Sequence, residues 1–400
     1  MKIVADENIP YIQAAFAPLG QVVCVPGRSM TPAILRDADA LLVRSVTQVG
    51  PALLDDTPVR FVGTATIGTD HIDLPYLARR NIRFTDAAGS NANSVAEYVL
   101  TALLTLAQRH RFKLNGKTLG IVGVGNIGSK IEKYAPVLGL QPLPNDPPLQ
   151  RLTGDKRYVS LDEALAADIV TLHVPLTRQG PDATYHLINK QTLGLLGPKT
   201  ILINASRGAV VDNQALNTAL AQHQLGPTVL DVWENEPTPN LDLLQRVALA
   251  TPHIAGYSLD GKVKGTLLLH QALCDFLNVN SRPDIQHLLP PAPVPQLTLD
   301  TSADDEALLT QAFQAIYDIN RDDSQLRGIA HQPANEQGAY FDRLRKQYSI
   351  RREAPGTRIH LQPQRNDLAH SLSLLGFCVE ETPNTPAPLV EPTLGPPCRP

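Results

Sequence analysis

Three polar residues that could transfer a proton and bind an anion follow three apolar runs in the middle of the chain. Arg207 lies in "NASRGAVVD", Glu236 in "DVWENEP" and His253 in "TPHIAG". The preceding runs are rich in Val, Ile and Leu without polar alternation, which is typical of parallel strands buried on both faces. Because ligands of such sheets bind at the carboxyl ends of the strands, we expect the three side chains to face one crevice.

The residue types predict an acid–base pair beside a site for a carboxylate. A histidine can take a proton from a hydroxyl, and a neighbouring glutamate can fix its tautomer and stabilise the imidazolium. The planar guanidinium of Arg207 matches two carboxylate oxygens, so we expect a substrate carboxylate rather than a protein acid as its partner. Each residue has a structural alternative: an arginine paired within the protein, a solvated loop acid, or one of the chain's many structural histidines.

A glycine-rich loop in "GIVGVGNIG" predicts a dinucleotide site. Gly123, Gly125 and Gly128 follow the strand-like run "TLGIV" and precede a helical pattern. In that context the glycines allow a tight turn, a close approach to a pyrophosphate, and close packing of the helix on the strand. Asp146, 18 positions after Gly128, is expected to bind the adenosine ribose hydroxyls and to favour NAD over NADP. The alternative is a glycine turn without a ligand.

The elements that position these residues are predicted to form two α/β units. The first hundred residues and residues 117–255 each alternate short apolar runs with helical patterns, which implies two Rossmann-like, doubly wound parallel sheets. A buried helix over 93–110 is expected to join them. Pro142 and Pro144 would remove ladder donors from the strand before the acidic residue, so we expect that strand to be short or irregular.

The remainder of the chain predicts a small α+β domain. The proline-rich stretch 289–295 is typical of an extended linker, and helical and strand patterns continue to about residue 380. Residues 381–400 carry many prolines and are expected to be a disordered tail. A basic run within 343–352, flanked by acidic residues, is interpreted as a solvated helix face. It comprises Arg343, Arg345, Lys346, Arg351 and Arg352.

Composition limits the class of protein. A length of 400 residues, with 43% hydrophobic and 18% charged residues, indicates a globular chain of two or three domains. The net charge of −4 gives no field that would attract nucleic acid. We find no secretory signal and no apolar run long enough to span a membrane. The four scattered cysteines favour a reducing compartment, so we expect a cytoplasmic protein.

The motifs "GIVGVGNIG", "NASRGAVVD", "DVWENEP" and "TPHIAG", in this order, resemble the D-isomer-specific 2-hydroxyacid dehydrogenases over about residues 1–285. The resemblance implies hydride transfer between NAD and a 2-hydroxy acid. It also implies a substrate domain of residues 1–95 and 256–285 around an NAD-binding domain of residues 96–255. The stretches "MKIVADENIP" and "AAGSNANSVAEY" are similar to members that act on a phosphorylated 2-hydroxy acid. These members carry a further domain, here residues 290–380, through which they form homodimers.

The resemblance also implies roles for individual residues. It makes Arg207, Glu236 and His253 catalytic. The implied cofactor-binding residues are Gly123, Gly125, Asn126, Ile127, Gly128, Asp146, Pro175, Ala205, Ser206, Arg207, Asp231 and Gly256, and those implied to contact the substrate are Ser45, Thr66 and Tyr257. We add Arg44, which ends a strand-like run, as a cation for the substrate phosphate; a surface arginine is the alternative. No metal site is expected.

Two other functions share most of these features. A phosphoglycerate dehydrogenase or a general 2-oxoacid reductase of the same family would carry the same three catalytic residues. A non-catalytic NAD sensor, like the transcriptional corepressors related to this fold, would need the glycine loop. It would not need the full set of arginine, glutamate and histidine, and their presence favours an enzyme.

Overall fold

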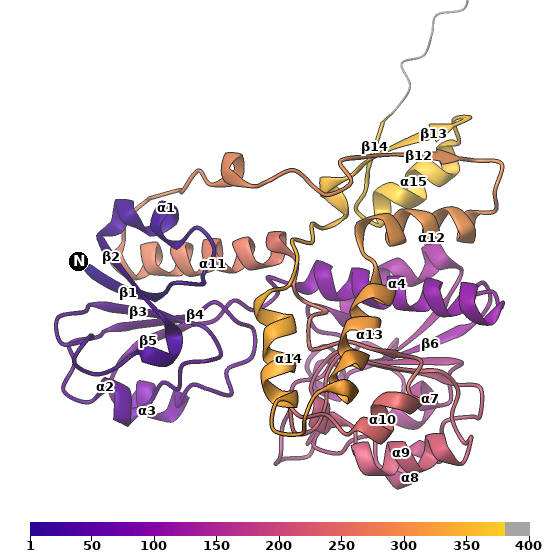
Figure 1. Cartoon of the computed structure of the whole chain (residues 1–400), viewed down its shortest axis with the longest axis horizontal. Coiled ribbons are helices and arrows are strands. Elements are labelled where there is room, and N and C mark those ends of the chain that lie inside the picture. Colours follow the sequence, from indigo (N-terminus) through magenta and orange to yellow (C-terminus); the bar gives the residue numbers. More distant parts are fainter. Residues whose placement is uncertain (381–400) are drawn as a thin grey trace, which may run out of the picture.

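Two parallel sheets, each covered by helices on both faces, form two lobes, and a third small sheet lies at one end (Figure 1). The computed structural model describes residues 1–380. The tail expected at 381–400 lies outside the described residues. The predicted fold class, two Rossmann-like sheets with a small C-terminal sheet domain, is confirmed.

The first lobe contains a five-stranded parallel sheet in the order β2-β1-β3-β4-β5. Its strands are β1 (Lys2–Asp6), β2 (Gln21–Val25), β3 (Ala40–Val43), β4 (Phe61–Thr64) and β5 (Arg83–Thr85). Helices α1 (Ile12–Phe16) and α11 (Leu259–Leu277) cover one face, and α2 (Pro51–Leu54) and α3 (Leu74–Arg79) the other. The strand order reverses at β1 and β3, so their carboxyl ends, at Asp6 and next to Arg44, flank a position where such sheets bind ligands.

The second lobe contains a six-stranded parallel sheet in the order β11-β10-β9-β8-β6-β7. Its strands are β6 (Thr118–Val122), β7 (Gln141–Asn145), β8 (Ile169–Leu172), β9 (Ile201–Asn204), β10 (Thr228–Leu230) and β11 (Leu249–Ala250). The helices between them are α5 (Gly128–Tyr134), α6 (Pro147–Thr153), α7 (Leu161–Leu165), α8 (Lys190–Leu193), α9 (Asn213–Ala221) and α10 (Leu241–Arg246). The order reverses at β6 and β8, where the glycine loop begins.

Strand β7 corrects one expectation. It is regular and pairs with β6 through all five of its residues, from Gln141 to Asn145. Pro142 and Pro144 are tolerated because β7 is an edge strand, which needs ladder donors on one side only. Prolines two residues apart leave the same side of a strand without donors.

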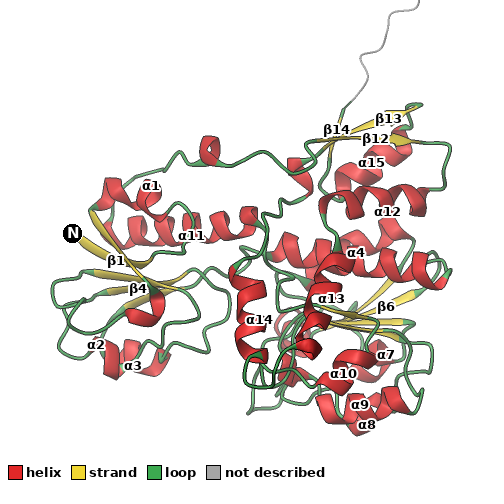
Figure 2. Cartoon of the chain, in the orientation of Figure 1, coloured by secondary structure: helices red, strands yellow, loops and turns green. Residues whose placement is uncertain are grey.

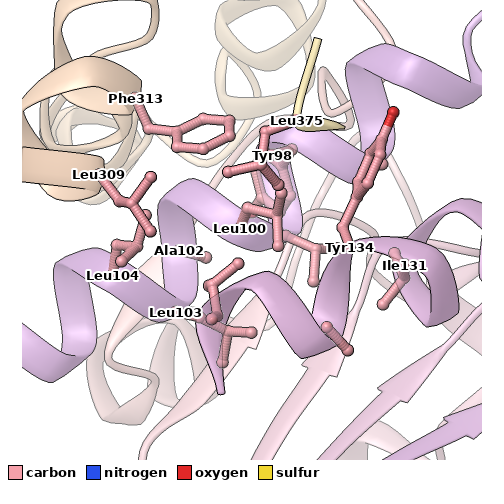
Figure 3. Close-up of a cluster of buried hydrophobic side chains, with 14 of the residues drawn as sticks. Tyr98, Leu100, Ala102, Leu103, Leu104, Ile131, Tyr134, Leu309, Phe313 and Leu375 are labelled. Atoms are coloured by element: carbon pink, nitrogen blue, oxygen red, sulfur yellow. The ribbon is translucent and has the colours of Figure 1, made fainter. Parts of the chain in front are cut away.

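Helix α4 (Ala92–His110) is buried over most of its length and joins three parts of the molecule. Figure 3 shows Leu103 and Leu104 of α4 among side chains of α5 and of α12 (Asp305–Ile316). Ile131 of α5 and Phe313 of α12 belong to the same buried cluster. One apolar core therefore continues from the second sheet through α4 into the C-terminal part of the chain.

The C-terminal segment reaches both its own sheet and the second lobe (Figure 2). Strands β12 (Gln296–Asp300), β13 (Arg358–Gln362) and β14 (Cys378–Val379) form a small parallel sheet packed on α12 and α15 (Asn366–Leu374). Helices α13 (Ile319–Arg327) and α14 (Gln337–Lys346) instead pack on the second lobe, where Leu326 and Phe341 are fully buried. The domain boundaries at residues 95, 256 and 290 stay our proposal.

Within residues 1–380, no helix combines the length and the apolar character that crossing a membrane requires.

Candidate active site

His253 and Glu236 form a hydrogen-bonded pair in the loops that follow β11 and β10. The distance from Nδ1 of His253 to Oε2 of Glu236 is 2.8 Å. The other carboxylate oxygen of Glu236 accepts a hydrogen bond of 2.9 Å from the backbone N–H of Trp233. A carboxylate only accepts hydrogen bonds, so the pair assigns the proton to Nδ1 and leaves Nε2 free to accept one.

The ionisation of Glu236 suits this pairing. Burial by itself raises the pKa of Glu236, but the charge of His253, its hydrogen bond and the Trp233 N–H together outweigh burial. The pKa of Glu236 therefore lies below its usual value, and the carboxylate is ionised at neutral pH. An ionised partner stabilises the imidazolium that forms when His253 takes a proton.

Asp231, directly after β10, fixes the loop that carries His253. Its carboxylate accepts hydrogen bonds from the backbone N–H groups of Ile254 at 2.8 Å and Ala255 at 3.0 Å, and from Oγ1 of Thr251 at 2.6 Å. The N–H of His253 donates to the carbonyl of Asp231 at 2.7 Å, and His253 has a φ of 58°. The geometry of Asp231 supports a positioning role for the histidine; its predicted contact with the cofactor stays a prediction.

Arg207 follows β9 and lies against the first lobe. A side chain at Gly68 would be 2.1 Å from Nη2 of Arg207, so the guanidinium sits directly on the loop after β4. Its Nε is 3.6 Å from Oδ2 of Asp70, and Nη1 donates to the carbonyl of Ser206 at 2.8 Å. Asp70 is thus a protein acid beside Arg207, but it is 69% exposed and such pairs contribute little; the substrate carboxylate that we expect as the partner of Arg207 stays a prediction.

Gly208 is required by packing within the lobe. A Cβ at this position would lie 2.0 Å from the carbonyl carbon and oxygen of Trp233. The N atom of the next residue, Glu234, would lie 2.6 Å away. Gly208 thus lets the Arg207 loop contact the backbone that holds Glu236 in place.

The glycine loop has the shape that a dinucleotide requires. Gly123 has a φ of 90°, and a Cβ there would meet the carbonyl of His173 at 2.7 Å; one at Gly128 would meet the carbonyl of Gly123 at 2.0 Å. A Cβ at Gly125 has nothing within 4 Å, which leaves open space at the start of α5. Asp146 accepts backbone hydrogen bonds from Val124 at 2.9 Å and Leu149 at 3.0 Å, so it holds the loop beside β7. These residues fit a pyrophosphate and an adjacent ribose.

The other residues predicted to bind the cofactor line the same edge of the second sheet. Ala205 and Ser206 are buried directly after β9, and Pro175 is exposed after β8. Two of the predicted residues lie against the segment that leads into α4: Asn126 is 3.1 Å from the Cβ position of Gly89, and the Cβ position of Gly256 is 2.0 Å from Nδ2 of Asn91. Ile127, the N-cap of α5, is half-buried.

The residues predicted to contact the substrate come from the first lobe and from the start of α11. Ser45 is exposed after β3. Oγ1 of Thr66 lies 2.7 Å from Oγ1 of Thr64, which is 3.0 Å from Nε2 of the buried His71, so a polar chain fixes Thr66. Tyr257 is half-buried, three residues before Asp260 in the first turn of α11. Their substrate contacts stay predictions.

Neither His253 nor Glu236 lines either of two large cavities in the described part of the chain. One of about 730 Å³ in the first lobe is lined in part by Asp70 and His71, and one of about 720 Å³ lies between α4 and α12. No group of acidic, histidine and cysteine side chains suited to a metal ion occurs in the described part of the chain.

Comparison with known proteins shows the family. Residues 91–255 match the NAD-binding domain of the D-isomer-specific 2-hydroxyacid dehydrogenases, and residues 288–376 match a domain of unknown function, DUF3410. The chain is 46% identical to the erythronate-4-phosphate dehydrogenase of Tolumonas auensis, over 95% of this chain and 99% of the relative. It is 50% identical to that of Edwardsiella ictaluri, over 88% and 93%. The chain belongs to the erythronate-4-phosphate dehydrogenase family.

Solved structures extend the comparison to the wider 2-hydroxyacid dehydrogenase fold. The D-lactate dehydrogenase of Aquifex aeolicus, complexed with NAD and lactic acid, is 25% identical with a TM-score of 0.56. It covers 70% of this chain and 96% of its own. The NAD-dependent formate dehydrogenase of Staphylococcus aureus, in complex with NAD, is also 25% identical, with a TM-score of 0.58, and covers 71% and 98%. This member of the erythronate-4-phosphate dehydrogenase family is an NAD-dependent oxidoreductase.

Sequence reasoning did not single out Lys262 and Arg345, two cations that lie over the ring of Tyr257. The prediction that the basic run at 343–352 is a solvated helix face holds for the exposed Arg343 and Lys346 only. Arg345 is half-buried, and Arg351 is 3% exposed with its Nη2 donating to the carbonyl of Ser94 at 2.8 Å. No local signal separates the buried members from the exposed ones, because their surroundings come from distant parts of the chain: α4 around Arg351 and Tyr257 beside Arg345.

Proposed function

We propose that this protein oxidises 4-phospho-D-erythronate at C2 to (R)-3-hydroxy-2-oxo-4-phosphobutanoate with NAD, a step of pyridoxal 5'-phosphate biosynthesis. The observation that carries the proposal is the His253–Glu236 pair, 2.8 Å apart, at the sheet edge that also carries the glycine loop. NAD, when bound, accepts the hydride that leaves C2, and the hydroxyl proton is transferred to the protein. The oxidised product therefore gains a C2 carbonyl.

His253 is the base of this reaction. Its Nε2 accepts the C2 hydroxyl proton, and Glu236 holds the ring in the required tautomer through Nδ1. Proton transfer of this kind contributes about 10²- to 10⁴-fold to a rate. Asp231 supports the same geometry by fixing the loop backbone on both sides of the histidine.

Arg207 binds the C1 carboxylate and polarises the C2 oxygen. It lies between the second sheet and the loop after β4, so a substrate carboxylate in the cleft would replace or join the exposed Asp70 as its partner. Thr66 lies on that loop, two residues before Gly68, and Ser45 and Tyr257 complete the contacts we propose for the substrate.

The substrate assignment is tested by steady-state kinetics of NADH formation. We expect a clearly higher kcat/KM with 4-phospho-D-erythronate than with 3-phospho-D-glycerate. A phosphoglycerate dehydrogenase would give the reverse order, and that result would overturn the assignment. Equal, very low rates with both compounds would point to the sensor function instead.

We further propose a cytoplasmic homodimer formed through the C-terminal sheet. The resemblance to family members that dimerise through this domain supports the dimer, as does the exposed face of the sheet, which includes Thr298 and Gln362. Cys24, Cys274 and Cys378 are free thiols, in keeping with a reducing compartment. Light scattering coupled to gel filtration tests the dimer; a monomer mass would contradict it.

A further inference from the structure

The ring of Tyr257 lies between two cations that come from different parts of the chain. Nζ of Lys262, in the second turn of α11, is 4.3 Å from the ring centroid, and Cζ of Arg345, near the end of α14, is 5.5 Å from it. Tyr257 itself follows the loop of His253 by four positions. Arg345 is also close enough to Glu236 for its charge to help lower the pKa of that carboxylate, so this cation lies near the proton-transfer pair.

Helix α14 is held in place by both lobes. Phe341 is fully buried in the core of the second lobe, and Gly338 packs on the loop of Glu236, its Cβ position 3.2 Å from Cγ of Pro237. On the other side, Asp342 lies 3.8 Å from Arg28 of the first lobe. These contacts fix the position and rotation of α14 relative to the second lobe, and therefore the position of Arg345. In Figure 1, α14 stands between the two lobes.

Arg44 supplies a third cation from the first lobe. It directly follows β3, and its Nε is 3.2 Å from Oδ2 of Asp6 at the end of β1. These two strand ends flank the reversal of strand order in the first sheet, the position where ligands bind in doubly wound sheets. The buried Asp6 holds the stem of Arg44 at that position.

Of the three cations, here called the cation cluster, only Arg44 has an acidic partner among the described residues, the carboxylate of Asp6. Among the described residues, neither Lys262 nor Arg345 forms an ion pair, and Nε of Arg345 is buried without a hydrogen-bond partner. Burial, together with the charges of Arg44 and Arg345, lowers the pKa of Lys262 to about 8. Bringing like charges together at a half-buried site costs free energy unless an anion binds there.

We propose that Arg44, Lys262 and Arg345 bind the phosphate group of the substrate, and that α14 thereby makes the C-terminal domain a part of the active site. The inference rests on the proposed function for the identity of the substrate. A phosphate accepts several charge-assisted hydrogen bonds at once, which suits a cluster of guanidinium and ammonium groups.

Comparison with a solved relative is consistent with a role of the C-terminal domain in binding the phosphate. The structure with lactic acid, an acid without a phosphate, covers 96% of its own chain but 70% of this one. The segment 288–376, which includes α14, has its own family match, to a domain without an assigned function. Recognition of the phosphate is a role that this domain performs within one chain, independent of any dimer.

The test compares Arg345→Gln with the control variant Arg343→Gln. Arg343 is exposed on the same helix, and its Cζ lies 5.0 Å from the ring centroid of Tyr340. Each variant is assayed with 4-phospho-D-erythronate and with D-erythronate, which lacks the phosphate. Loss of a charge-assisted contact predicts an increase of about 10- to 100-fold in KM for the phosphorylated substrate in Arg345→Gln. We expect no change with D-erythronate, and none with either substrate in Arg343→Gln.

Two outcomes separate this inference from the proposed function. If the wild type oxidises 4-phospho-D-erythronate and Arg345→Gln keeps its KM within twofold, the inference is overturned and the proposed function stands. If the wild type does not oxidise it, calorimetric titration with inorganic phosphate decides: binding by the wild type and by Arg343→Gln, but not by Arg345→Gln, supports the site. Equal binding by all three overturns it. Lys262→Met, checked for NAD binding, replaces Arg345→Gln if that variant fails to fold.

Discussion

The proton-transfer pair and the cation cluster are neighbours, but the chain assembles them in different ways. His253 and Glu236 come from two consecutive loops of one sheet, 17 positions apart, and a single carboxylate, that of Asp231, fixes the histidine loop. The cations come from β3 of the first lobe, from α11 and from α14, and no two of them share an element. The residues that transfer the proton thus lie within one lobe. The residues that bind the phosphate of the substrate come from three separate parts of the chain.

This difference has a physical basis. The carboxyl ends of parallel strands lie at the same edge of the sheet. Residues that directly follow neighbouring strands are therefore close together in space. Arg345 reaches Tyr257 only because α14 packs on the second lobe through Phe341 and on the loop of Pro237. A site built across lobes can change its substrate by changing one helix, while the proton-transfer pair stays intact.

The largest effect should come from removing the base. We expect His253→Ala to lower kcat by at least about 10²-fold, because proton transfer by a positioned base is worth about 10²- to 10⁴-fold. The affinity for NAD, measured by fluorescence titration, should stay within twofold, since the glycine loop is untouched. An unchanged kcat would contradict the role of His253 as the base.

Two glycine variants test different properties: Gly208→Ala tests the packing of the catalytic loops, and Gly125→Ala tests the binding of NAD at the glycine loop. Gly208→Ala places a Cβ 2.0 Å from the Trp233 carbonyl. We expect it to lower the free energy of unfolding by about 1–3 kcal/mol, as overpacking does, and to lower kcat because the Trp233 N–H holds Glu236. Urea denaturation measures the first effect.

Gly125→Ala is the matched variant, since its Cβ meets nothing within 4 Å and its φ suits alanine. It should leave the free energy of unfolding unchanged or raise it by about 0.4–1 kcal/mol. The dissociation constant of NAD should increase at least about tenfold, because the methyl group fills the space for the pyrophosphate. Equal losses of stability in the two variants would contradict the assignment of Gly208 to packing and of Gly125 to NAD binding.

The smallest effect concerns pH and Lys262. Because its pKa in the folded protein, about 8, lies below the ordinary 10.5, the free energy of unfolding loses a contribution as pH falls from about 10.5 through 8. A bound phosphate favours the charged form, so KM for the phosphorylated substrate should rise as pH increases through about 8. Lys262→Gln should flatten both dependences. A pH-independent KM in the wild type would exclude Lys262 from the site.

Most of the fold and of the catalytic edge could be predicted from the sequence, for local reasons. Gly123, Gly125 and Gly128 stand in a strand–loop–helix context that specifies the turn, and Arg207, Glu236 and His253 each follow an apolar strand. The position of Arg345 could not be predicted, because it depends on how α14 packs against the second lobe and on the ring of Tyr257, 88 residues earlier in the chain.

The regular β7 and the packing of α13 and α14 on the second lobe were missed for a related reason. The effect of Pro142 and Pro144 depends on whether the strand lies at an edge, and that is set by the neighbouring strands. Likewise, nothing in the pattern of α13 states whether Leu326 faces β12 or the second sheet. Both are decided by tertiary contacts rather than by local propensity.

The measurement that tests the account most directly is a crystal structure of the protein with NAD and 4-phospho-D-erythronate. We predict the C2 hydroxyl within hydrogen-bond distance of Nε2 of His253, and the phosphate oxygens in contact with Arg345, Lys262 and Arg44. A phosphate bound instead in the first-lobe cavity beside His71, or a C2 hydroxyl distant from His253, would contradict it.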